Sequence, residues 1–137
     1  DDNALSWKRF RAELVGVTDP AKAAASSLRG MIRKRWNELG LSEEPSIGEN
    51  AIHASASPFE ALAERLNWLN IPLEADGYGQ FLLKCGLTKE TIRAWSTDPV
   101  VRWAENPIGS SIFDAFEDLD SMPLAVRAVQ IANQLVE

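Results

Sequence analysis

The sequence predicts an α+β protein that is mainly α. Apolar residues recur at three-to-four spacing in most segments of the chain, which is typical of amphipathic helices. Glycine, proline and helix-capping residues separate these segments. Only residues 51–54, Ala-Ile-His-Ala, read as a short strand. Helices are therefore expected to form most of the fold and nearly all of its C-terminal half.

The N-terminal region is expected to hold three helices. Residues 4–15 carry apolar side chains near helical spacing among charged ones. Asp19 and Pro20 offer a cap followed by a proline at the first helical position, which predicts a short helix over residues 21–25. Residues 31–39 also look helical.

The strongest helix signal begins at Ser57. The Ser57 hydroxyl can accept from the backbone N–H three residues later, and Glu60 at that position can reach back in return. Pro58 suits the first helical position. A helix is therefore expected from Pro58 until Pro72 stops it, with a buried face of Phe59, Leu62, Leu66 and Leu69.

The rest of the chain is expected to be helical. Its helical segments are separated by Gly86, the Asp98-Pro99 pair, residues 107–109 and Ser121, all of which favour turns or caps. The helices are expected over residues 77–84, 88–95, 111–119 and 122–136.

Composition and charge narrow the function classes. A chain of 137 residues that is 45% hydrophobic can form one domain with a single core. Its net charge of −6 makes nucleic acid an unexpected partner. No apolar run approaches the roughly 20 residues that cross a bilayer, so no membrane span is expected.

The lone cysteine, Cys85, excludes an internal disulfide. We therefore expect an intracellular, reducing compartment, and the sequence does not distinguish cytoplasm, cilium and organelle. The same scarcity of thiolates, with a single histidine, predicts no metal site of the chain's own.

Three motifs surround that histidine, His53. They are Thr18-Asp19-Pro20, then Ser27-Leu28-Arg29-Gly30, then the run Asn50-Ala-Ile-His-Ala-Ser-Ala-Ser57. In order and spacing they resemble the second half of nucleoside diphosphate kinases, whose patterns are T-N-P-x-x-A, G-[ST]-[IL]-R-G and N-x-x-H-G-S-D-S. In that family the histidine carries a phosphoryl group.

The resemblance implies a role for each matching residue. His53 would be the nucleophile, Glu64 would accept a hydrogen bond from the imidazole and orient it, and Ser55 matches a serine of the catalytic motif. Thr18 and Arg29 would hold nucleotide phosphates, and Asn50 would contact the sugar hydroxyl. Magnesium would enter only with a bound nucleotide such as ATP. No other cofactor is implied.

The resemblance covers residues 1–70 and begins after the third strand of the family fold. The first half, with its lysine and tyrosine, has no counterpart in the sequence. Residues 1–70 are therefore interpreted as an incomplete ferredoxin-like half, with an insertion near residues 31–48, and residues 71–137 as a helical C-terminal extension. A single strand cannot pair its own backbone groups. Its partner strands would come from a longer polypeptide or from another chain, and these two explanations are favoured. The third explanation is a fold that has been rebuilt around helices.

Several positions differ from the family patterns. Ala54 replaces the glycine after the histidine, Ala56 replaces an aspartate, and Met31 replaces the aspartate after Arg-Gly. The basic residues on either side of Gly30 could extend a phosphate site, but a solvated helix face is favoured. This cluster comprises Arg29, Arg33, Lys34 and Arg35.

Two functions follow from the sequence. The favoured one is a nucleoside diphosphate kinase-like module that serves as a structural or nucleotide-binding subunit, with protein partners in a larger protein or assembly. The alternative is an active nucleoside diphosphate kinase that transfers a terminal phosphate between nucleotides through phospho-His53. The first function is favoured because the lysine that positions the phosphates in the family lies in the half of the fold that has no counterpart in this sequence.

Overall fold

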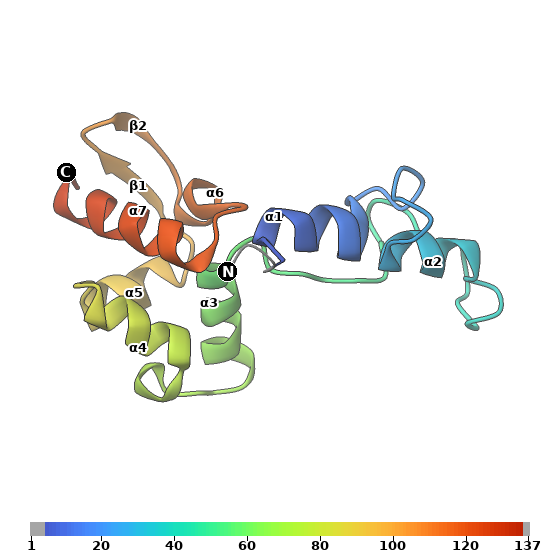
Figure 1. The fold of residues 1–137 in the computed structure, drawn as a ribbon, viewed down its shortest axis with the longest axis horizontal. Coiled ribbons are helices and arrows are strands. Elements are labelled where there is room, and N and C mark those ends of the chain that lie inside the picture. The colour runs from blue at the N-terminus through green and yellow to red at the C-terminus, as the bar shows by residue number, and fades with distance from the viewer. Residues whose placement is uncertain (1–4, 136–137) are drawn as a thin grey trace. The chain divides into compact units, whose positions relative to one another are not determined.

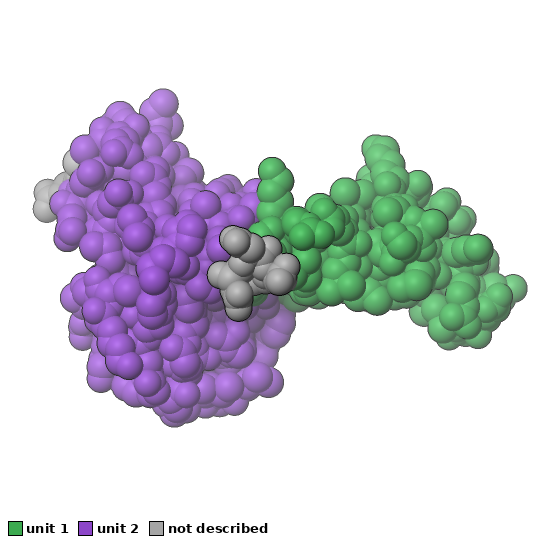
Figure 2. All heavy atoms as spheres, viewed as in Figure 1, with its two compact units in different colours: residues 1–54 green, residues 55–137 purple. Residues whose placement is uncertain are grey.

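The protein is mainly α with some β structure. The computed structural model describes residues 5–135 and divides into two compact units, residues 1–54 and residues 55–137 (Figure 2). Each unit is described separately. Among the described residues, no helix combines the length and the apolar character needed to cross a membrane.

Unit 2, residues 55–137, combines short helices with a β-hairpin (Figure 1). The hairpin strands β1 (Val100–Trp103) and β2 (Asn106–Ser111) are antiparallel, with Val100 opposite Ser111 and Trp103 opposite Asn106. The remaining elements are α3 (Pro58–Trp68), the 3₁₀ turn η2 (Leu73–Ala75), α4 (Gly77–Lys84), α5 (Lys89–Trp95), α6 (Ile112–Phe116) and α7 (Ser121–Asn133).

The core of unit 2 forms around Phe59 on α3. Its side chain is fully buried, and its ring lies 6.4 Å from Trp95, 6.2 Å from Phe113 and 5.4 Å from Phe116, measured between ring centroids. These tilted and edge-on contacts are favourable aromatic geometries. The cluster joins α3 to α5 and α6, and α3 also packs against α4 and α7.

The predicted start of α3 is confirmed. The Ser57 hydroxyl accepts the N–H of Glu60 at 3.2 Å, and Pro58 occupies the first turn. The Glu60 carboxylate accepts the N–H of Ala56, one residue before the position expected for a reciprocal cap. The predicted burial of Leu69 is wrong: α3 ends at Trp68, and Leu69 is 63% exposed.

The helices predicted beyond α3 are also found. Residues 77–84 and 88–95 correspond closely to α4 and α5. The helix predicted over residues 122–136 is α7, which ends at Asn133, and residue 136 lies outside the described residues. The predicted helix over residues 111–119 is the shorter α6, because Glu117 leaves the helical conformation and Asp118 has φ of 61°.

The predicted strand over residues 51–54 is wrong. These residues have no strand pairing, and Ala51 has φ of 67°, which is incompatible with extended backbone. The β structure forms instead at residues 100–111, where a turn was predicted around Pro107 and Gly109. A strand requires a partner for its backbone groups, and the local sequence does not specify where that partner lies.

Unit 1, residues 1–54, contains less regular structure. Helix α1 (Trp7–Arg9) continues into a π-helical segment, η1 (Phe10–Gly16), so a helix forms near the predicted residues 4–15. Residues 21–25 form turns rather than the predicted helix. Helix α2 (Leu28–Lys34) begins and ends earlier than the predicted residues 31–39. It begins at Leu28 because the Ser27 hydroxyl accepts the N–H of Gly30 and caps the helix.

Glycine is required where α2 meets the preceding turn. A Cβ at Gly30 would lie 2.1 Å from the carbonyl oxygen of Ala24, and one at Gly16 would lie 2.4 Å from the Ser27 hydroxyl oxygen. Gly16 also has φ of +96°. Any side chain at these positions would therefore displace backbone or a buried cap.

Unit 1 buries little apolar surface. Among its described residues, Val15 is the one large aliphatic or aromatic side chain that is fully buried. Eight others are between 36% and 61% exposed: Leu5, Leu14, Val17, Leu28, Met31, Leu39, Leu41 and Ile47. The main core of the protein therefore belongs entirely to unit 2.

A buried carboxylate connects two elements of unit 2. Asp76 is 6% exposed and accepts from the Arg65 guanidinium at 2.7 and 3.1 Å. The same carboxylate accepts the N–H groups of Tyr78 and Gly79 at 2.9 Å, which caps α4. Hydrogen bonding from Arg65 is the main cause that lowers the Asp76 pKa, and burial opposes it.

We expect Asp76→Ala to lower the free energy of unfolding by about 2–3 kcal/mol, because it removes a helix cap and leaves Arg65 without its partner. Asp76→Asn retains a capping oxygen but loses the charge, so it should cost less. Urea unfolding of the two variants provides the measurement. Equal losses for Ala and Asn would show that capping by residue 76 contributes nothing.

Stability should also depend on pH through Asp76. Because its pKa is lowered in the folded state, the unfolded chain binds the proton more readily, and the stabilisation is complete above the ordinary aspartate pKa. It is lost as the pH falls through the lowered folded value. The stability advantage of the wild type over Asp76→Asn should therefore be constant from about pH 7 to about pH 5 and shrink as the pH falls further, to about pH 3 and below. A constant difference in urea unfolding across this range would contradict the assignment.

Candidate functional site

The predicted nucleophile lies in an irregular segment. His53 is exposed and follows Ile52 in a stretch without helix or strand. Just before it, the Asn50 side-chain oxygen accepts the N–H of Ile52 at 3.4 Å, which shapes a local turn. Asn50 therefore makes a backbone contact, and its predicted contact with a sugar hydroxyl stays a prediction.

Arg29 ties this segment to the rest of unit 1. One terminal nitrogen of its guanidinium donates to the Gly16 carbonyl at 2.6 Å, and the other donates to the Ile52 carbonyl at 2.7 Å. Burial, and secondarily the charge of Arg11, lowers the Arg29 pKa. The guanidinium thus connects α2 to the residue that precedes His53.

The other predicted phosphate ligand, Thr18, is exposed at a bend. The adjacent Asp19 carboxylate accepts the N–H of Ala21 at 3.0 Å and forms an ion pair with Lys22 at 3.3 Å. Asp19-Pro20 therefore starts a turn rather than a helix. Thr18, Arg29 and Asn50 all belong to unit 1, together with His53.

Ser55 and Glu64 come together within unit 2. The Ser55 hydroxyl donates to a carboxylate oxygen of Glu64, which lies on α3. The sequence predicts that Glu64 orients His53; His53 belongs to unit 1 and Glu64 to unit 2. The hydrogen bond between Ser55 and Glu64 is therefore the one contact that is described among these three residues, and the predicted pairing of Glu64 with His53 stays a prediction.

The basic cluster does not converge on one point. Arg33 pairs with Glu44 at 2.7 Å and Arg35 pairs with Glu38 at 2.8 Å, while Arg29 donates to backbone carbonyls. Exposed pairs of this kind are typical of a solvated surface. This arrangement favours the solvated-face interpretation of the cluster.

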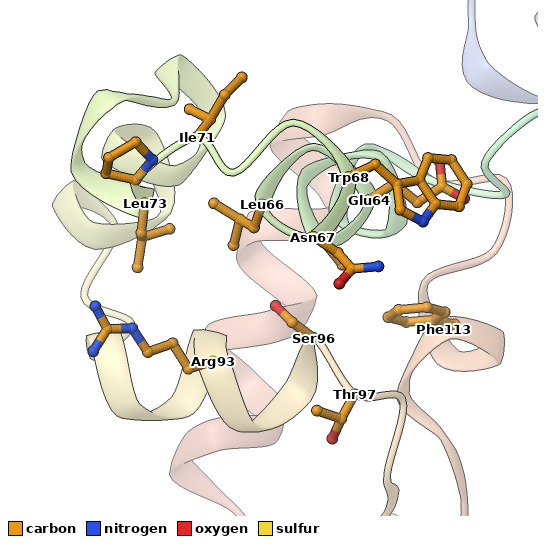
Figure 3. Close-up of a pocket in the computed structure, with 12 residues that line it drawn as sticks. Glu64, Leu66, Asn67, Trp68, Ile71, Leu73, Arg93, Ser96, Thr97 and Phe113 are labelled. Carbon is orange, nitrogen blue, oxygen red and sulfur yellow. The ribbon is translucent and has the colours of Figure 1, made fainter.

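Sequence reasoning missed a groove in unit 2 (Figure 3). We call it the α3–α5 groove; its volume is about 540 Å³ and it is open to solvent. Its residues come from the end of α3, the turn to η2, α5 and α6. They are Ala63, Glu64, Leu66, Asn67, Trp68, Ile71, Pro72, Leu73, Arg93, Ser96, Thr97 and Phe113. The signal in the sequence was Trp68, an apolar residue near the helix end that lies outside the predicted buried face.

Comparison with known proteins adds no relative to this description. No family model, curated protein or solved structure matches the chain. Within the described part of the chain, no three His, Cys, Asp or Glu side chains are grouped so that they could hold a metal ion.

We expect Arg29→Ala to loosen unit 1, because two carbonyl groups lose a charged donor, at a cost of about 2–3 kcal/mol. Hydrogen exchange of backbone amides in residues 50–54 and in α2 should accelerate. Arg35→Ala serves as the control, because its guanidinium pairs only with the exposed Glu38. Equal exchange rates in the two variants would contradict a structural role for Arg29.

Proposed function

We propose that this chain is a nucleoside diphosphate kinase-like module that acts as a structural or nucleotide-binding subunit of a larger protein or assembly. The observation that carries the proposal is the poor burial of unit 1. One large aliphatic or aromatic side chain is fully buried among its described residues, and eight others are substantially exposed. Exposed apolar side chains in this number favour a surface that another protein segment covers.

The order of the sequence motifs supports the kinase-like part of the proposal. The Thr-Asp-Pro, Arg-Gly and Asn-x-x-His motifs all lie in unit 1, the unit with the exposed apolar side chains. In the resemblance this region is half of a ferredoxin-like fold, whose sheet is completed by strands from the other half.

The contacts of Arg29 support a structural over a catalytic role. A guanidinium that stabilises a transferred phosphoryl group must direct its donors at the phosphate oxygens. Here both terminal nitrogens donate to backbone carbonyls, at 2.6 and 2.7 Å. Binding phosphate through Arg29 would require these two bonds to break or to be shared.

The contact between Ser55 and Glu64 favours the alternative function. The two residues match motif positions of the kinase family, and a hydrogen bond joins them. A carboxylate held in this way could orient an imidazole in an active nucleoside diphosphate kinase. Phosphoryl transfer through His53, with magnesium bound to the nucleotide, therefore stays as the second candidate.

Incubation with radiolabelled magnesium-ATP distinguishes the two functions. The chain is tested alone and in its native assembly, and labelled protein is examined for phosphate that is acid-labile and alkali-stable, as phosphohistidine is. For a structural subunit we expect no such label in either sample. Label that forms in the assembly and disappears in His53→Ala would overturn the structural assignment and establish the enzyme.

Ser57→Ala provides a control for His53→Ala in that experiment. It removes the α3 cap, which should cost about 1 kcal/mol of stability, but leaves the imidazole in place. Label lost in both variants would indicate unfolding, whereas label lost only in His53→Ala would assign it to the histidine.

A further inference from the structure

The α3–α5 groove presents unused hydrogen-bonding groups. Asn67 on α3 makes no side-chain hydrogen bond with the described residues, so its amide offers both a donor and an acceptor. The hydroxyls of Ser96 and Thr97 donate to the carbonyls of Ile92 and Ala94 at 2.8 and 2.9 Å. Their oxygens therefore retain lone pairs that can accept. A peptide backbone, with alternating N–H and C=O groups, complements this set.

Two charged side chains line the groove, the Glu64 carboxylate, which accepts from Ser55, and the Arg93 guanidinium. Arg93 on α5 is exposed and forms no ion pair or hydrogen bond through its side chain within the described part of the chain. The Glu74 carboxylate pairs with Lys89 at 2.6 Å. Hydrogen bonding from Lys89 is the main cause that lowers the Glu74 pKa, and the positive charge of Arg93 lowers it a little further. A guanidinium has planar, paired donors that fit a carboxylate. The complementary group in a ligand is an acidic side chain.

Apolar side chains form the remaining walls. The apolar lining residues include Leu66, Ile71, Phe113 and Trp68, and Trp68 is 61% exposed (Figure 3). Leu69, which is 63% exposed, follows Trp68 directly. Aromatic and aliphatic side chains of this kind are frequent anchor points in protein interfaces. An open groove that continues into exposed apolar surface fits an extended segment better than an enclosed small molecule.

We propose that the α3–α5 groove binds an extended peptide segment of a partner protein, which places apolar side chains on Leu66, Ile71 and Phe113 and an acidic side chain on Arg93. The Asn67 amide pairs with the backbone of that segment, and the Ser96 and Thr97 oxygens accept from its N–H groups. This inference rests on the proposed function as a subunit that holds a partner, and it locates one contact in unit 2.

Selection from a library of phage-displayed random peptides, about twelve residues long, tests the proposal on the full chain. We expect enriched peptides to combine apolar residues with Asp or Glu. One such peptide, synthesised with a fluorescent label, is then titrated with the chain, and its dissociation constant is measured by fluorescence polarisation. Arg93→Glu should weaken binding by at least about tenfold. Arg102→Glu, which makes the same charge change on β1 away from the groove, should change it by less than about twofold.

A second pair of measurements isolates the salt bridge. Replacing the acidic residue of the peptide by its amide should weaken binding to the wild type, and Arg93→Gln should make the chain insensitive to that replacement. Circular dichroism checks that each variant is folded, and Arg93→Gln replaces Arg93→Glu if the latter unfolds. No enriched peptide, enriched peptides without an acidic residue, or equal binding by the Arg93 and Arg102 variants would each overturn the proposal.

These results are distinct from those of the labelling experiment. A chain that forms no phosphohistidine and selects no groove-dependent peptide would keep the structural assignment and lose this binding site. A chain that is phosphorylated on His53 would lose the structural assignment, whatever peptide the groove binds.

Discussion

The burial of Phe59 is the constraint on which unit 2 depends. Its ring contacts Trp95 of α5 and Phe113 and Phe116 of α6, so the first turn of α3 is fixed to both helices. The ion pair from Arg65 to Asp76 fixes the later part of α3 to the cap of α4. These contacts hold α3 at two points, and the α3–α5 groove lies beside its last turn.

Unit 1 depends on hydrogen bonds to backbone rather than on burial. Arg29 joins carbonyl groups that lie 13 residues before it and 23 residues after it, and Ser27 caps α2 while donating to the Ala24 carbonyl at 2.7 Å. Such bonds define a conformation but contribute only modest net stability, about 1 kcal/mol for a typical neutral one. The two units therefore differ in kind: one has an apolar core, and the other has a polar framework with apolar residues on its surface.

Local signals predicted the helices of unit 2, and non-local contacts account for most errors. Ser57, Pro58 and the apolar spacing of α3 act within a few residues, so they could be read directly. The hairpin at residues 100–111 depends on pairing between strands, and residues 51–54 have strand-like composition but no neighbour. The motif predicts that Arg29 holds phosphates, and its observed carbonyl partners, Gly16 and Ile52, could not be predicted because they are distant in sequence. The groove combines residues of four segments, and Asn67 and Arg93 alone look like ordinary surface residues.

The contact between Gly30 and Ala24 bears on how the Arg-Gly motif is interpreted. A carbonyl oxygen 2.1 Å from the position of a Cβ excludes every larger residue, and Arg29 beside it holds two carbonyls. Both positions are therefore intolerant of substitution for reasons of architecture alone. A chain with no phosphoryl-transfer activity would still need this dipeptide for its fold. The local fold therefore explains the Arg-Gly dipeptide, whether or not any reaction takes place there.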